Sequence, residues 1–120
     1  MICLWAAGAL WASLGLDGFG LSWTHSVEKI EWREEWRVEN GRLSVVEARV
    51  KGSGAGMEPP DGARLTDGWW VYVPDLAPLA EIVLARSDAT ADWRLCLGEC
   101  RPLADWVPLE AGTTTIRPCG

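Results

Sequence analysis

Residues 29–50 alternate between apolar and polar side chains around a central Asn40-Gly41, and this pattern constrains the fold more than any other feature of the chain. A period of two residues is typical of a strand with one buried face. A helix is the competing interpretation, because Trp32 and Trp36 are four residues apart and Glu and Arg favour helices. Asn-Gly tolerates the positive φ angles of a two-residue turn, so the pattern predicts a β-hairpin.

Similar short runs of alternating or β-branched residues recur along the rest of the chain and predict an all-β fold. The expected strands are at residues 2–16 (one or two strands), 19–26, 29–39, 42–50, 68–73, 80–87, 92–97 and 113–118. A glycine- and proline-rich connection at residues 51–68 is too short to separate two domains. We therefore expect residues 1–120 to form a single-domain antiparallel β-sandwich or barrel-like fold of about eight short strands.

The net charge argues against one class of partner. The chain carries 17 Asp and Glu against 11 Lys and Arg, a net charge of −6, and it has no run of basic residues. Its average surface repels a phosphate backbone, so we expect no nucleic acid as a partner. Nine Trp against one Phe and one Tyr is an unusual aromatic composition. Trp suits both cores and binding surfaces, and we expect most of these residues to pack in the core and across strands.

The apolar segment at residues 2–16 has the look of a targeting sequence. It spans only about 15 residues before Asp17, whereas a membrane-spanning helix needs about 20. No Lys or Arg precedes it, so the basic region of a secretory signal is missing. We expect buried strands here and no membrane attachment, with a degenerate signal or a truncated anchor as the alternative.

Four cysteines allow two pairings on geometric grounds. Cys96 and Cys100 can face each other across a three-residue hairpin loop, while Cys3 and Cys119 lie near the two ends of the chain. Chain ends are often close together in a domain. Two disulfides would favour an oxidising compartment, and four reduced, half-buried thiols are the alternative. The spacing lacks the two close Cys pairs that a four-thiolate zinc site needs.

The hairpin predicts a pair of carboxylates on its apolar face. With Asn40-Gly41 as the loop, the cross-strand pairs are Glu39–Arg42, Val38–Leu43, Trp36–Val45, Glu34–Glu47 and Trp32–Arg49. Like charges directly opposite destabilise a sheet unless a proton, a cation or an arginine offsets them. Arg49 is the next residue after Glu47 on the same face of the strand and can offset the two negative charges. Its guanidinium can also lie over Trp32. A bulge near Glu34-Glu35 would turn one glutamate outward, and an open sheet end would leave Glu34 and Glu47 as solvated rim charges.

His25, the only histidine, closes the apolar stripe of residues 19–26. If residues 26–29 turn back as a hairpin, His25 pairs with Ile30; if the strand crosses to another sheet, His25 faces the two carboxylates. A buried, hydrogen-bonded histidine without a further role is the alternative. The glycine-rich run Gly52–Met57 overhangs the same end of the sheet, where its N–H groups form either an anion-binding nest or a plain flexible connection. It lacks the Lys-Ser/Thr ending of a P-loop.

Three motifs resemble the signature of the domain of unknown function 1850 (DUF1850) family. They are HSVEK at residues 25–29, Glu34-Glu35, and VEARVKGSGAGMEP at residues 46–59. Members typically carry His-Ser-Val-Glu-Lys, then Glu-Glu, then Glu-Thr-Arg and a Ser-x-Gly-Ala-Gly-x-Pro-like loop. Here Ala48 stands where Thr is common, and an extra Glu58 precedes Pro59.

The resemblance implies an association with a transporter and does not imply a specific reaction. The family has no characterised activity, and its members are often found beside, or fused to, components of TAXI-type tripartite ATP-independent periplasmic (TRAP) transporters. This implies an accessory role in solute uptake, with TRAP membrane or solute-binding components as partners. The resemblance and the even number of cysteines favour the periplasmic side of the cell envelope, the missing signal sequence favours the cytoplasm, and both stay open.

We therefore expect a non-enzymatic accessory or binding module without a cofactor. Its candidate pocket comprises His25, Ser26, Glu28, Glu34, Glu47, Arg49, Gly54 and Gly56. Trp69 and Trp70 add an apolar wall. One alternative is a metal-binding or hydrolytic site built on His25, Glu34 and Glu47, because one His and two carboxylates can hold a divalent ion with open positions. The other alternative is a purely structural interaction domain.

Overall fold

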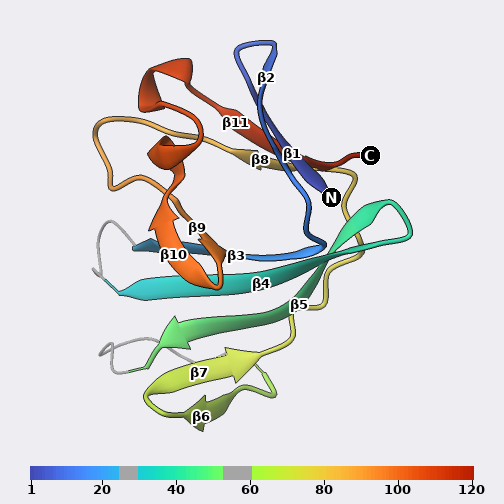
Figure 1. Cartoon of the computed structure of the whole chain (residues 1–120). Helices are drawn as coiled ribbons and strands as arrows, with labels where there is room; N and C mark the ends of the chain where they lie inside the picture. Colours follow the sequence, from blue (N-terminus) through green and yellow to red (C-terminus); the bar gives the residue numbers. More distant parts are fainter. Residues whose placement is uncertain (25–29, 53–60) are drawn as a thin grey trace.

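Two antiparallel sheets pack against each other in the computed structural model of the chain, which describes residues 1–24, 30–52 and 61–120 (Figure 1). Within these ranges the strands are β1 (Ile2–Ala6), β2 (Ala9–Leu14), β3 (Gly18–Thr24), β4 (Glu31–Glu39), β5 (Arg42–Lys51), β6 (Arg64–Thr66), β7 (Trp69–Tyr72), β8 (Ile82–Leu84), β9 (Arg94–Leu97), β10 (Glu99–Pro102) and β11 (Thr114–Pro118). Two short 3₁₀ turns, η1 (Leu103–Asp105) and η2 (Leu109–Ala111), precede β11. The expected all-β sandwich class is confirmed.

The small sheet has the strand order β2-β1-β11-β8, and the large sheet has the order β10-β9-β3-β4-β5-β7-β6. The described part of the chain thus forms eleven strands, more than the eight or so expected. Two of the additional strands, β6 and β10, are only three and four residues long and carry charged residues. Such short edge strands give too little alternation to be recognised from sequence.

The core lies between the small sheet and one half of the large sheet. Its buried members include Ile2, Leu4 and Ile116 from the small sheet, and Leu21 and Trp36 from the large one. Of the two N-terminal strands, β1 is buried as expected, whereas β2 lies at a sheet edge and is largely exposed. Neither helical turn of the described chain has the length and apolar character of a membrane-spanning helix.

The β4–β5 hairpin turns where the sequence predicts it. Asn40 and Gly41 have φ angles of 53° and 73°, as a two-residue turn of this kind requires. The predicted pairs from Glu39–Arg42 to Trp36–Val45 are confirmed. A bulge then shifts the register between Glu35 and Trp36, and the pairs beyond it are Glu35–Glu47, Glu34–Ala48, Arg33–Arg49 and Trp32–Val50.

The predicted pairs Glu34–Glu47 and Trp32–Arg49 are therefore wrong. Val46 is the extra residue on β5, and one extra residue moves every later side chain of that strand to the opposite face. Ala48 and Val50 consequently face inward and are buried, while Glu47 and Arg49 face outward. The bulge that the sequence offered as an alternative is the arrangement that occurs.

Two disulfides cross-link the chain, and they close loops of very different length. Cys3 and Cys119 join β1 to the segment after β11 with a sequence separation of 116, whereas Cys96 and Cys100 join β9 to β10 with a separation of 4. In the chain-entropy model these loops correspond to about 5 and about 2 kcal/mol of stabilisation. The first disulfide therefore contributes more to stability, and the second fastens a hairpin that its own ladder already holds.

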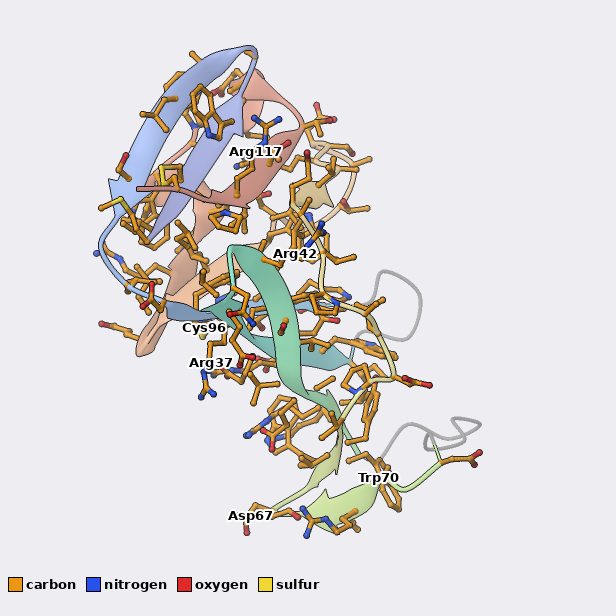
Figure 2. All side chains as sticks on the ribbon, turned by 90° about the vertical axis from the view of Figure 1, so that its right-hand side faces the viewer. Arg37, Arg42, Asp67, Trp70, Cys96 and Arg117 are labelled. Atoms are coloured by element: carbon orange, nitrogen blue, oxygen red, sulfur yellow. A yellow bond between two sulfur atoms is a disulfide. The ribbon has the colours of Figure 1, made fainter. Side chains whose placement is uncertain are left out.

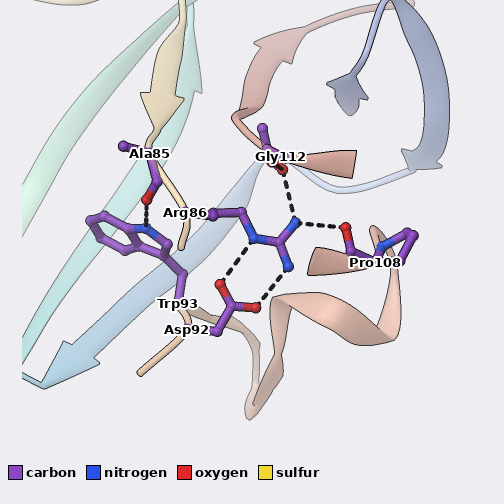
Figure 3. Close-up of polar contacts among 7 residues, drawn as sticks. Ala85, Arg86, Asp92, Trp93, Pro108 and Gly112 are labelled. Atoms are coloured by element: carbon purple, nitrogen blue, oxygen red, sulfur yellow. Dashed lines mark hydrogen bonds and ion pairs between the residues drawn. The ribbon is translucent and has the colours of Figure 1, made fainter. Parts of the chain in front are cut away.

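A buried ion pair fixes the connection between β8 and β9 (Figure 3). The Arg86 side chain is fully buried and donates two hydrogen bonds to the Asp92 carboxylate, of 2.9 Å from Nε and 2.7 Å from Nη2. Its Nη1 donates to Thr114 Oγ1 at 3.0 Å and to the Pro108 carbonyl oxygen at 3.4 Å. One guanidinium therefore ties this connection to β11 and to the turn before η2.

Candidate functional site

Only part of the predicted pocket falls in the described ranges. His25, Ser26, Glu28, Gly54 and Gly56 lie outside the described residues, whereas Glu34, Glu47 and Arg49 lie within them. The strand ends nearest these residues are described: Thr24 pairs with Glu31, and Lys51 pairs with Trp69. Both pairs lie at the same end of the large sheet (Figure 1).

The β3–β4 ladder follows the register predicted from a hairpin return. Trp23 pairs with Trp32, and Thr24 pairs with Glu31. The next pair in this register would be His25–Ile30, but His25 lies outside the described residues, so that pairing stays a prediction.

Glu34 occupies an apolar position on the inner face of the large sheet. Its direct neighbours across the strands are Leu21 on β3 and Ala48 on β5, both buried. The Trp36 indole Nε1 donates a 3.2 Å hydrogen bond to Glu34 Oε1. Burial raises the pKa of the Glu34 carboxyl above its ordinary value of 4.5, and the Trp36 hydrogen bond partly opposes that shift. A carboxyl in such a position is expensive to keep charged.

Tyr72 is a neighbour of Glu34 that the sequence did not single out. It pairs with Ala48, so it lies on the same face one strand further along. Burial raises the pKa of the Tyr72 hydroxyl, and the negative charge of Glu34 raises it further. The sequence pattern indicates this neighbour only weakly, because β5 and β7 are separated by a long connection.

Several tryptophans share this inner face with Glu34. The Trp23 and Trp32 rings are stacked with centroids 6.1 Å apart, and the Trp93 ring lies 5.0 Å from Trp23. Trp70 is aligned with Trp32 through Val50 and lies at the end of the large sheet away from the small one (Figure 2). We call the set Trp23, Trp32, Trp70, Tyr72 and Trp93 the aromatic face. All five side chains are half-buried.

The aromatic face carries an unsatisfied donor. Trp32 Nε1 is buried, and no hydrogen-bond acceptor lies in reach of it within the part of the chain that the structure describes. A buried indole N–H usually finds an acceptor, so Trp32 Nε1 is an exception among the described residues. Trp32 Nε1 and the Glu34 carboxyl are thus two polar groups buried among apolar and aromatic side chains.

Glu47 and Arg49 form an ion pair on the outer face, so the expected pairing of these two residues is present on the side opposite to Glu34. On the neighbouring strand, Arg33 Nε lies 2.7 Å from Glu35 Oε1. Like charges are opposed across the strands, Arg33 to Arg49 and Glu35 to Glu47. Each charge is offset along its own strand instead, which removes the cost of the cross-strand repulsion.

The expected position of the Arg49 guanidinium over Trp32 is wrong, because the two side chains project from opposite faces. The cations that lie over rings in the described ranges are Lys51, 4.8 Å from the Trp69 centroid, and Arg117, 5.8 Å from the Trp5 centroid. Trp69 therefore belongs to the outer face, whereas its neighbour Trp70 belongs to the aromatic face.

A metal or hydrolytic centre that used Glu34 and Glu47 together does not fit this register, since the sheet backbone separates the two carboxylates. Within residues 1–24, 30–52 and 61–120, no group of three or more His, Cys, Asp or Glu is placed to hold a metal ion. The geometry instead isolates Glu34 among aromatic rings.

The raised pKa of Glu34 gives a pH-dependent prediction. A carboxyl whose folded pKa lies above its unfolded value favours the folded state at low pH, and this contribution is lost as the pH rises through the folded pKa. Glu34→Gln removes the titration, so we expect this variant to be more stable than the parent protein at pH 7. The gap should close below the ordinary value of 4.5. Urea unfolding between pH 3.5 and 7.5 measures it, and a pH-independent gap would contradict the assignment.

Gly20 is required by a close approach on the outer face. A Cβ atom there would lie 3.0 Å from Cys96 Cβ and 3.1 Å from Glu35 Oε2. Overpacking at a well-packed site typically costs about 1–3 kcal/mol, so we expect Gly20→Ala to lower the free energy of unfolding by that amount. Gly15→Ala is the matched control, because nothing lies within 4 Å of its Cβ position. Equal urea midpoints for the two variants would contradict the close approach.

Comparison with known proteins identifies a family for most of the chain. The model of the family described as "Domain of unknown function (DUF1850)" matches residues 19–103. No curated protein and no solved structure matches the chain. The match covers more than half of the residues and includes all three sequence motifs, as well as β3 (except its first residue) to β10.

Proposed function

The chain belongs to the DUF1850 family, and we propose that it is a non-enzymatic accessory module of a TAXI-type TRAP transporter, which it contacts through the aromatic face. The transporter association comes from the family resemblance, in which members are found beside or fused to TRAP components. The two disulfides support a position on the periplasmic side of the cell envelope.

The observation that carries this proposal is the chemistry of the aromatic face. Trp32, Trp70 and Tyr72 are absent from the cluster of side chains that packs around the main core. Half-exposed aromatic area with a few polar groups is a common composition for the centre of a protein interface. The Glu34 carboxyl lies on the same inner face, and the strand ends at Thr24, Glu31 and Lys51 lie at this end of the sheet.

Copurification with defined components tests the association. The affinity-tagged chain is coexpressed with the membrane subunits and the solute-binding component of a TAXI-type TRAP transporter and purified in mild detergent. We expect stoichiometric coelution with one of these components. If none of them coelutes with the tagged protein, the transporter association is wrong.

Two matched pairs of variants test the contact surface. Trp32→Leu and Glu34→Gln change the aromatic face, whereas Trp11→Leu on β2 and Glu39→Gln at the end of β4 change exposed positions elsewhere. Truncating a central aromatic side chain typically weakens an interface by about tenfold or more. We expect that loss in the first pair only, measured by biolayer interferometry on variants with unchanged circular dichroism. Equal affinities in all four would assign the contact to another surface.

The structural alternative has its own supporting observation. On the outer face, Arg33 pairs with Glu35 along β4 and Arg49 pairs with Glu47 along β5, without any ligand. This charge cluster accounts for the outer charges as mutual neutralisation within each strand. It does not account for Glu34, which adds a buried charge and whose neighbours are apolar or aromatic.

A further inference from the structure

A disulfide and a carboxylate share one row on the outer face of the large sheet. The observed pairs are Cys100–Cys96 across β10 and β9, Cys96–Gly20 across β9 and β3, and Gly20–Glu35 across β3 and β4. Directly paired residues project to the same side of a sheet. Gly20 has no side chain, so Cys96 and the Glu35 carboxylate lie against the same patch of bare backbone.

The two cysteines of this disulfide differ in exposure. Cys96 is only 2% exposed, whereas Cys100 is half-buried on β10, the edge strand of the sheet. A depression of about 280 Å³ on this face is lined by Cys96, Gly98, Glu35 and Arg37, among others. Cys100, on the edge strand, is therefore the more exposed of the two cysteines and the one that an incoming group can approach from solvent.

Opening this disulfide leaves the fold in place. Cys96 and Cys100 are neighbours in a hairpin whose ladder runs from Leu97–Glu99 to Arg94–Pro102. Both cysteines remain on adjacent strands when the bond breaks, because backbone hydrogen bonds hold the hairpin. The Cys3–Cys119 bond is different, since it joins the two ends of the chain and closes a far longer loop. The oxidised and reduced forms at Cys96–Cys100 are therefore both folded states.

We propose that Cys96–Cys100 is a thiol–disulfide exchange site that accepts two electrons from an external dithiol. A thiolate of the dithiol attacks Cys100 Sγ; the Cys96–Cys100 bond breaks, and Cys96 leaves as a thiolate that takes a proton from water. The second thiolate of the dithiol then attacks the other sulfur of the same dithiol, which is bonded to Cys100 in the mixed disulfide. This forms the oxidised dithiol and releases Cys100 as a thiolate, which is protonated in turn. The inference does not depend on the transporter role.

Glu35 tunes the first step of this exchange. Its carboxylate and Cys96 Cβ lie against the same point beside Gly20, so its negative charge disfavours a leaving thiolate at Cys96 and slows the opening. The ion pair with Arg33 offsets part of that charge. Glu35 thus acts through Cys96 and slows reduction of the disulfide. Cys100 stays accessible to a dithiol because it lies on the edge strand.

Differential reduction tests the site in the full chain. The unreduced protein is treated with dithiothreitol at pH 7, quenched with acid, alkylated and mapped by peptide mass spectrometry. We expect Cys96–Cys100 to open at least about tenfold faster than Cys3–Cys119, with the near-ultraviolet circular dichroism retained. Similar rates for the two disulfides, prior opening of Cys3–Cys119, or loss of the dichroism in step with the first reduction would overturn the proposal.

Single substitutions test the roles of the individual groups. Cys96→Ser leaves the Cys100 thiol, and Cys100→Ser leaves the Cys96 thiol. We expect the Cys100 thiol to react with 5,5′-dithiobis(2-nitrobenzoate) at least about tenfold faster. Glu35→Gln should speed the dithiothreitol reduction of Cys96–Cys100 by about threefold or more, whereas Glu39→Gln should not. Equal thiol reactivities overturn the direction of attack, and an unchanged rate in Glu35→Gln overturns the role of the carboxylate.

Discussion

Replacing Asp92 by alanine is expected to destabilise the protein by about 3–5 kcal/mol, because it leaves the fully buried Arg86 guanidinium without its counter-charge. The remaining partners of Arg86, Thr114 Oγ1 and the Pro108 carbonyl oxygen, are neutral and cannot replace a carboxylate. The free energy of unfolding from urea titration at pH 7 measures the loss. Thermal unfolding should show a decrease in Tm of about 10 °C or more.

A surface ion pair supplies the control for this result. Arg101 and Asp105 are also in ionic contact, at 3.0 Å, but their side chains are 61% and 38% exposed. Solvent screens such pairs, so Asp105→Ala should cost roughly 1 kcal/mol or less. An Asp92→Ala loss no larger than that of Asp105→Ala would show that Arg86 finds solvent when its partner is removed.

A double variant separates the worth of the ion pair from the cost of breaking it. Arg86→Met combined with Asp92→Leu replaces both charges by apolar groups and leaves no buried charge unpaired. Such replacements are often neutral or stabilising where single removals are strongly destabilising. We expect the double variant to recover most of the stability that Asp92→Ala loses, which identifies the uncompensated guanidinium as the cause.

The β4–β5 hairpin shows how far a local signal extends. Asn40-Gly41 specifies the turn and the first pairs through backbone conformation, and those pairs are observed. The bulge at Val46 lies beyond that influence. It does leave a trace in the sequence, because Leu43 and Val45 follow one phase of the alternation while Ala48 and Val50 follow the other. Two adjacent valines at the change of phase are the sign of an extra residue on β5.

The residues of the candidate site show the same difference between local and cross-strand signals. The position of Glu34 depends only on its own strand, where Trp32 and Trp36 have the same parity, and that inner position is observed. The position of Glu47 depends on the register across two strands, and a single bulge reversed its face. Features that join distant segments leave no local pattern at all, and the contact of Arg86 with Thr114 is one of these.

Removing the Cys3–Cys119 disulfide is the second change with a large expected effect. Replacing both cysteines by alanine abolishes a link with a sequence separation of 116, for which chain entropy gives a loss of about 5 kcal/mol. β1 and β11 then keep their ladder, from Ile2–Pro118 to Ala6–Thr114, without a covalent tie between the two ends. The unfolded chain gains far more freedom than the folded one, which is the source of the loss.

The matched control is the double alanine variant of Cys96 and Cys100, whose sequence separation of 4 corresponds to about 2 kcal/mol. Urea unfolding of the two double variants and the parent protein at pH 7 gives both losses in one experiment. A ratio near the expected one assigns the stabilisation to loop closure in the unfolded chain. Equal losses would instead assign the stabilisation to local packing of the sulfur atoms. They would also contradict the view that Cys3–Cys119 stabilises the fold while Cys96–Cys100 can open without unfolding it.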